Sequence, residues 1–90
     1  MVARIPGHGV ADFQRYEDEV LPLPAAHGGR LEQRLRSGDA LVEVHIVSFP
    51  TRAAFQAYRA DPRRAAAQPW LERSGAEVEL LELRDVPSPM

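Results

Sequence analysis

Cysteine and lysine are both missing from this chain of 90 residues. Without cysteine the chain forms no disulfide bond, and it offers no thiolate to a metal ion, an iron–sulfur cluster or a nucleophilic reaction. All 11 basic residues are arginine, so Schiff-base chemistry and the lysine of a nucleotide-binding P-loop are excluded. These two absences remove several large classes of enzyme before any motif is considered.

Long apolar runs and an excess of one charge are missing as well. No run approaches the roughly 18 apolar residues of a membrane-spanning helix, and the first residues lack the apolar core of a signal peptide, so we expect a cytoplasmic protein. The formal net charge is −2, with acids and arginines interleaved, whereas nucleic-acid binders normally carry a basic stripe. We therefore expect neither a membrane nor a nucleic acid as a partner.

The composition that remains is that of a small folded domain. Hydrophobic residues make up 44% and charged residues 27% of the chain, which is typical of a globular protein. Ninety residues leave no room for a second hydrophobic core. We expect a single domain over residues 1–86, followed by a frayed tail over residues 87–90.

Periodicity and turn residues predict four strands and two helical regions, the second of them in two parts. Strands are expected over residues 2–5, 30–36, 41–49 and 77–84. A helix with an apolar stripe starts at residue 10 and is kinked by Pro22 and Pro24, and Glu17–Asp18–Glu19 is interpreted as its solvated face. Thr51 caps a further helix, and a short one follows Asp61 until Pro69 interrupts it near residue 67.

This order predicts an α+β fold of the ferredoxin-like βαββαβ kind, a four-stranded antiparallel sheet with its helices on one face. The first and third strands are then central, and the second is an edge strand. We expect Val42, Val44 and Ile46 to face the helices. The opposite face would carry Leu41, Val47 and Phe49, and a patch of this kind favours a homodimer through the open face of the sheet.

Four segments resemble a dimeric α/β-barrel family of unknown function. They are Phe13-x-x-Tyr16-Glu17-x-x-Val20-x-Pro22, His27-Gly28-Gly29-Arg30-Leu31, Glu43-Val44-His45-Ile46-x-x-Phe49-Pro50 and Ala54-Phe55-x-Ala57-Tyr58-x-x-Asp61-Pro62. The superfamily with this fold also contains antibiotic-biosynthesis-type monooxygenases, muconolactone isomerase-like enzymes and haem-degrading proteins. No catalytic motif of these enzymes matches the chain, so the resemblance implies a dimeric fold and assigns no active residue.

The hairpin around residues 37–40 supplies the candidate catalytic residues His45, Glu43 and Arg34. A two-residue turn pairs residues whose numbers add up to 77, which places Arg34 opposite Glu43 and Glu32 opposite His45, on the face away from the helices. A histidine held by a carboxylate is a possible general base. The same residues also make ordinary cross-strand ion pairs, and this structural interpretation is favoured.

Three aromatic residues are the candidates for ligand binding. Tyr16, Tyr58 and Trp70 are candidates for lining a ligand pocket between the helices and the sheet, although aromatic residues at helical spacing more often belong to the core. A metal site is not expected, because Glu43 and His45 alone are two ligands. His8 and His27 are interpreted as exposed histidines in glycine-rich turns.

Two functional hypotheses follow. The first is a homodimeric domain that binds a small molecule or a partner, without assigned catalysis and without a cofactor. The alternative is a cofactor-independent monooxygenase, isomerase or cyclase that acts on a hydrophobic oxygenated small molecule. Fold alone decides neither, since this scaffold carries many unrelated functions.

Overall fold

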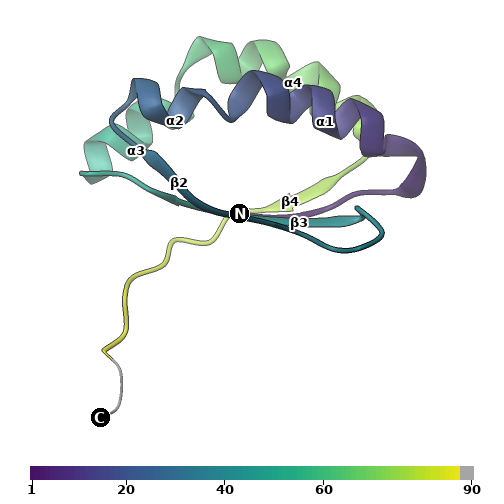
Figure 1. The fold of residues 1–90 in the computed structure, drawn as a ribbon. Coiled ribbons are helices and arrows are strands. Elements are labelled where there is room, and N and C mark those ends of the chain that lie inside the picture. The colour runs from purple at the N-terminus through teal and green to yellow at the C-terminus, as the bar shows by residue number, and fades with distance from the viewer. Residues whose placement is uncertain (88–90) are drawn as a thin grey trace.

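The helices lie in one layer above a four-stranded antiparallel sheet (Figure 1). The computed structural model describes residues 1–87, so the predicted tail lies outside the described residues except for Pro87. In chain order the elements are β1 (Val2–Arg4), a 3₁₀ turn (Gly7–Gly9), α1 (Val10–Val20), α2 (Leu23–Ala26), β2 (Arg30–Arg36), β3 (Val42–Ser48), α3 (Arg52–Arg59), α4 (Pro62–Ser74) and β4 (Glu77–Glu79). The expectation of an α+β domain with this kind of sheet is confirmed.

The strands lie in the order β2-β3-β1-β4, so the predicted central positions of the first and third strands are confirmed. β1 pairs with β3 on one side and with β4 on the other, both antiparallel. Ala3 is opposite Glu43 in β3 and opposite Val78 in β4. The short β1 therefore holds the two halves of the sheet together.

Local signals set most of the helix ends. The Thr51 side chain accepts a hydrogen bond from the backbone N–H of Ala54 at 3.0 Å, and Asp61 accepts one from that of Arg63 at 2.9 Å, which caps α3 and α4. The predicted kink is a break between α1 and α2, with Pro22 just before the second helix. The expected end of the last helix near residue 67 is wrong, because α4 passes through Pro69 to Ser74. Trp70 and Leu71 pack against the core beyond that proline, which compensates for the missing backbone hydrogen bond.

The last strand is also shorter than predicted. β4 ends at Glu79 instead of residue 84, because its neighbour β1 is only three residues long and offers no backbone partners beyond that point. Residues 80–87 leave the body of the domain (Figure 1). Its apolar side chains include Leu83 and Val86, which are 78% and 83% exposed.

The core lies between the helices and the central strands. Its buried apolar members are Ala3, Ile5, Phe13, Tyr16, Val20, Leu23 and Ala67. The start of α1 lies against the end of α4, where a Cβ atom added to Gly9 would come within 1.8 Å of the Ser74 carbonyl oxygen. Only a glycine allows the two helices to approach so closely. Among the described residues, no helix has the length and apolar character needed to cross a membrane.

The two faces of β3 are the reverse of those expected. Glu43 and His45 are buried beneath the helices, whereas Val42 and Ile46 are exposed on the open face. Phe49 packs against Phe55 of α3, with ring centroids 5.4 Å apart. Hydrophobicity alone could not orient this strand, because both faces contain apolar residues and the polar pair on the buried face finds its partner on α1.

Candidate functional site

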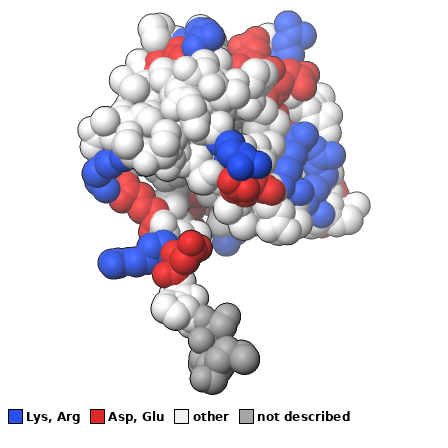
Figure 2. Space-filling model, turned by 60° about the vertical axis from the view of Figure 1, so that its left-hand side comes forward, with Lys and Arg blue, Asp and Glu red and all other residues white. Residues whose placement is uncertain are grey.

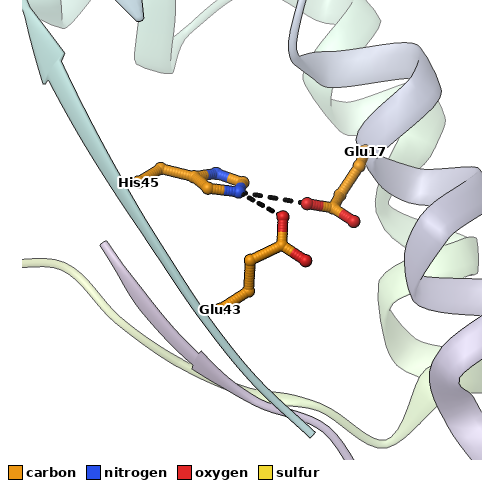
Figure 3. Close-up of side chains that lie close together, drawn as sticks. All are labelled: Glu17, Glu43 and His45. Atoms are coloured by element: carbon orange, nitrogen blue, oxygen red, sulfur yellow. Dashed lines mark hydrogen bonds and ion pairs between the residues drawn. The ribbon is translucent and has the colours of Figure 1, made fainter. Parts of the chain in front are cut away.

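Two carboxyl groups and one imidazole meet between the layers. Glu17 points from α1 toward the sheet, while Glu43 and His45 point from β3 toward α1 (Figure 3). The His45 Nε2 atom lies 2.7 Å from Glu43 Oε1 and 3.0 Å from Glu17 Oε2. Glu17 and Glu43 are each 1% exposed and His45 is 4% exposed. We call these three residues the buried cluster.

The positions of the three side chains follow from the two elements that carry them. Side chains two apart on a strand share a face, so Glu43 and His45 project together from β3. On α1, Glu17 lies one position from Tyr16 and three or four positions from Val20 and Phe13, within the stripe that faces the sheet. The interpretation of Glu17 as part of a solvated face is therefore wrong, whereas Asp18 and Glu19 are exposed.

Two arginines of β2 reach the cluster from the edge of the sheet. Arg34 Nε donates to Glu43 Oε1 at 2.6 Å, and Arg36 Nε donates to Glu43 Oε2 at 3.0 Å. Arg34 Nη2 also lies 3.0 Å from Glu17 Oε2. Both guanidinium groups remain partly exposed. The predicted contact between Arg34 and Glu43 is present, but on the helix side of the sheet.

The predicted register of the hairpin is wrong. Arg36 is opposite Glu43, and Arg34 is opposite His45. The turn is longer than expected because Ser37 pairs with Val42, with Ala40 in the left-handed region at φ 63°. A register shift between Leu31 and Gln33 displaces Glu32, so this residue does not face His45. It accepts a hydrogen bond from the Ser48 hydroxyl at 2.7 Å instead.

The environments of the two carboxyl groups differ sharply. Burial raises the pKa of Glu17. Burial also acts to raise the pKa of Glu43, but the contacts with Glu17, His45 and the two arginines outweigh it and hold that pKa well below its usual range. At neutral pH, Glu43 is therefore the ionised member of the pair, and Glu17 is the member that more readily keeps a proton.

Glu17 is poorly satisfied by the rest of the chain. The contacts at 3.0 Å from His45 and Arg34 to its Oε2 atom are not aligned as hydrogen bonds. Among residues 1–87, neither oxygen of its carboxyl group has a hydrogen-bond partner. A buried carboxyl group without hydrogen bonds is costly, so this side chain requires a reason other than packing.

The three aromatic candidates do not form one group. Tyr16 is buried in the core and stacks with Phe13. Tyr58 lies half-buried on α3 against Phe49, with ring centroids 5.1 Å apart. Trp70 lies on α4 between two guanidinium groups, each 4.9 Å from the ring centroid, which belong to Arg15 and Arg73.

The other histidines lie away from the buried cluster. His8 is exposed, as expected. His27 is not the free turn residue that was predicted, because its Nε2 atom lies 2.8 Å from Asp61 Oδ2 at the start of α4. This contact ties the segment after α2 to the cap of α4.

Two shallow hollows occur on the surface of the described chain, and neither is lined by the buried cluster or by the three aromatic candidates. One lies beside β1 and the end of α4, and is lined by Arg4, Ile5, Pro6, Leu41, Val42, Gly75 and Glu77. The other lies where α3 meets α4, and is lined by Arg59, Ala60, Asp61, Arg64, Ala65 and Gln68. Arg34 and Arg36 are the partly exposed side chains that contact the cluster.

Comparisons with protein-family models, with curated proteins and with solved structures gave no match to this chain.

The sequence identified three members of this site and missed two. His45, Glu43 and Arg34 were candidates, and the structure brings them together. Glu17 and Arg36 were missed. The signal for Glu17 was its place in the apolar stripe of α1, and the signal for Arg36 was its position two residues from Arg34, on the same face of β2.

Proposed function

We propose that the protein is a homodimeric domain of the ferredoxin-like kind that binds a small molecule at the buried cluster. The strand order and the position of the helices on one face support the proposed fold. The observation that carries the function is the burial of Glu17, Glu43 and His45 together in so small a domain. The rest of the protein gains little from it, because buried ionic groups are weak sources of stability.

The cluster has the properties of a binding site for an oxygenated molecule. It combines hydrogen-bond donors, acceptors and two titratable carboxyl groups with shifted pKa values, which gather at functional sites more often than elsewhere. Arg34 and Arg36 supply guanidinium groups at its exposed side, where they favour a ligand with carboxylate, enolate or phenolate oxygens.

The exposed surface supports a homodimer. The exposed apolar residues of the sheet include Leu35, Val42 and Ile46. These three lie on the open face, because they alternate along β2 and β3 with the residues that point toward the helices, namely Arg34, Arg36, Glu43 and His45. Apolar patches of this kind normally mark an interface.

The charges of the chain are also compatible with a second copy. Figure 2 shows the molecule from the side, with acidic and basic side chains close together on the body and on the segment that leaves it. Arg52 of the body pairs with Glu82 of that segment at 3.2 Å. Such mixed charges match a copy of themselves across a two-fold axis, and residues 80–87 then gain a partner for their apolar side chains.

One observation favours the enzymatic alternative. His45 lies between two carboxyl groups whose pKa values move in opposite directions, and such a divergence is how one site holds an acid and a base at the same pH. Under this second proposal, His45 moves a proton on a hydrophobic oxygenated substrate, as a cofactor-independent isomerase, cyclase or monooxygenase requires.

The first experiment is native mass spectrometry on untagged protein purified gently from its own host. A dimer that carries the mass of an organic ligand supports both parts of the proposal. Ile46→Glu should give a monomer because it places a charge at the centre of the open face, whereas Gln56→Glu on the exposed side of α3 should remain a dimer. A monomeric native protein, or a dimeric Ile46→Glu variant, would contradict the proposed interface.

The ligand part has its own control. Glu17→Gln should lose the retained ligand, and Glu19→Gln, a substitution on the exposed side of the same helix, should keep it. Retention of the ligand by Glu17→Gln with unchanged occupancy would remove the cluster from the binding site. For the enzymatic alternative, His45→Gln should bind the ligand and fail to convert it.

A further inference from the structure

We propose that Glu17, Glu43 and His45 bind a divalent transition-metal ion. The inference rests on the proposed function, because it treats the buried cluster as the binding site, and it adds the ion as the first component bound there. Each of the three residues offers one ligand atom, and these atoms all lie within 4.8 Å of one another.

The spacing of these atoms is close to that of a metal site. Bonds from zinc to imidazole nitrogen and carboxylate oxygen are about 2.0–2.2 Å, so two ligand atoms of a tetrahedral site lie about 3.3 Å apart. His45 Nε2 is 2.7 Å from Glu43 Oε1 and 3.0 Å from Glu17 Oε2. These two distances need to open by roughly 0.3–0.6 Å to reach that spacing. The two carboxylate atoms lie within 4.8 Å of one another, so side-chain torsions of Glu17 and Glu43 also adjust their separation when an ion binds.

The state of Glu17 is the second observation that indicates a ligand. Its carboxyl group is almost completely buried, it points at His45 and Glu43 (Figure 3), and neither oxygen has a hydrogen-bond partner among the described residues. Helix α1 therefore places a carboxyl group without hydrogen bonds at the centre of the cluster. A metal ion provides the directed bond that this carboxylate does not obtain from its unaligned contacts with Arg34 and His45 at 3.0 Å.

The donor set selects the kind of ion. One imidazole and two carboxylates suit zinc, iron(II) or manganese(II), whereas a calcium site takes six to eight oxygen ligands. Three protein ligands also leave a coordination position open, as catalytic and ligand-binding metal sites do. The second ring nitrogen of His45 points away from both carboxyl groups (Figure 3), so Nε2 is the coordinating atom.

Arg34 and Arg36 would orient a metal-binding carboxylate from outside the coordination sphere. Both donate to the Glu43 carboxylate, and hydrogen bonds of this kind orient ligating carboxylates in metal sites. Their two positive charges offset those of the two carboxylates, so a bound divalent ion leaves the site with a net charge of about +2. The open coordination position therefore favours an anionic oxygen, which is the ligand chemistry proposed above.

The test uses untagged, full-length protein stripped of metal with EDTA and then titrated separately with Zn²⁺ and Mn²⁺ by isothermal calorimetry, with the stoichiometry checked by native mass spectrometry. We expect one ion per chain for the native protein and for Glu19→Gln. Glu17→Gln should bind more weakly by more than the roughly 10–100-fold that loss of an outer partner costs. Circular dichroism establishes that each variant is folded.

Two outcomes would overturn the inference, namely no uptake of either ion by the native protein, or uptake by Glu17→Gln with unchanged affinity. The proposed function fails separately. If the stripped protein binds no ion but still carries the organic ligand found in the native preparation, the metal inference is wrong and the binding function stands. If an ion binds but no organic ligand is retained by the metal-loaded protein, the metal inference stands without the proposed function.

Discussion

Replacing Glu17 with leucine should make the protein more stable. Glu17 is 1% exposed and lies beside the apolar residues of α1 that face the core, so a leucine side chain of similar volume fits the space. The change removes no hydrogen bond, because the Glu17 carboxyl group makes none within residues 1–87. His45 and Arg34 both retain their hydrogen bonds to Glu43 Oε1, which are 2.7 and 2.6 Å long.

The size of the gain follows from other buried ionic groups. Replacing a whole buried ion pair or triad by apolar residues is often neutral or stabilises a protein by about 1–4 kcal/mol. Glu17→Leu removes a single member, whose contacts with Arg34 and His45 at 3.0 Å are not aligned as hydrogen bonds, so we expect a gain at the lower end of this range. For a domain of this size, each kcal/mol raises the midpoint of thermal unfolding by about 4–8 °C. Glu43→Leu is the matched control, and we expect it to destabilise the protein. Glu43 accepts hydrogen bonds from Arg34 and Arg36, and its Oε1 atom contacts His45 Nε2. Its loss should cost about 3–5 kcal/mol, as when one partner of a buried pair is removed.

The assay is urea unfolding at pH 7 in the presence of EDTA, followed by the fluorescence of Trp70, the one tryptophan of the chain. All variants are compared at the same protein concentration, because a dimer unfolds in a concentration-dependent way. A loss of more than about 1 kcal/mol in Glu17→Leu would show that Glu17 holds the layers together, and would refute the argument that its burial serves binding.

Two further predictions test the surroundings of the site. Gly9→Ala should destabilise the protein by about 1–3 kcal/mol or more, because its Cβ atom would lie 1.8 Å from the Ser74 carbonyl oxygen, whereas Gly7→Ala meets no atom within 4 Å and should be close to neutral in thermal unfolding. Hydrogen bonds from Arg63 and His27 hold the pKa of Asp61 well below its usual range. The stabilisation from the Asp61 carboxylate is therefore complete above a pH of about 4, which is the ordinary pKa of an aspartate in an unfolded chain. It is lost as the pH falls toward the lower pKa of Asp61 in the folded protein. The stability difference between the native protein and Asp61→Asn, which keeps a capping side chain, should therefore shrink between pH 5 and pH 2, and a constant difference would contradict the pairing.

The elements were predictable because their signals are local. Thr51 and Asp61–Pro62 mark helix starts through hydrogen bonds that span two or three residues. Pro22 breaks the first helix through its own ring. A sequence read in short windows contains such information in full, so the order of strands and helices emerged correctly.

The site needed information from outside those windows. Nothing in the neighbourhood of Val42–Ser48 says which of its faces the helices cover, since the answer depends on the placement of Glu17 above it, 26 and 28 residues earlier in the chain than Glu43 and His45. The register of the hairpin depended on the left-handed conformation of Ala40, a residue type that rarely adopts it. A two-residue error in the turn was enough to give the wrong cross-strand neighbours.

The buried cluster contains one residue of the helix layer, Glu17, and two residues of the sheet, Glu43 and His45. Ligand binding therefore depends on the packing of α1 against the sheet. A partly unfolded chain that keeps its sheet but releases α1 has His45 and Glu43 without Glu17, and it would bind the ligand poorly. Any molecule that binds the complete cluster therefore stabilises the docked state by RT ln(1 + [L]/Kd), which is about 2.7 kcal/mol at a hundredfold excess over Kd. Amide hydrogen exchange in α1 should slow accordingly, so the mobility of this one helix follows the ligand concentration around the protein.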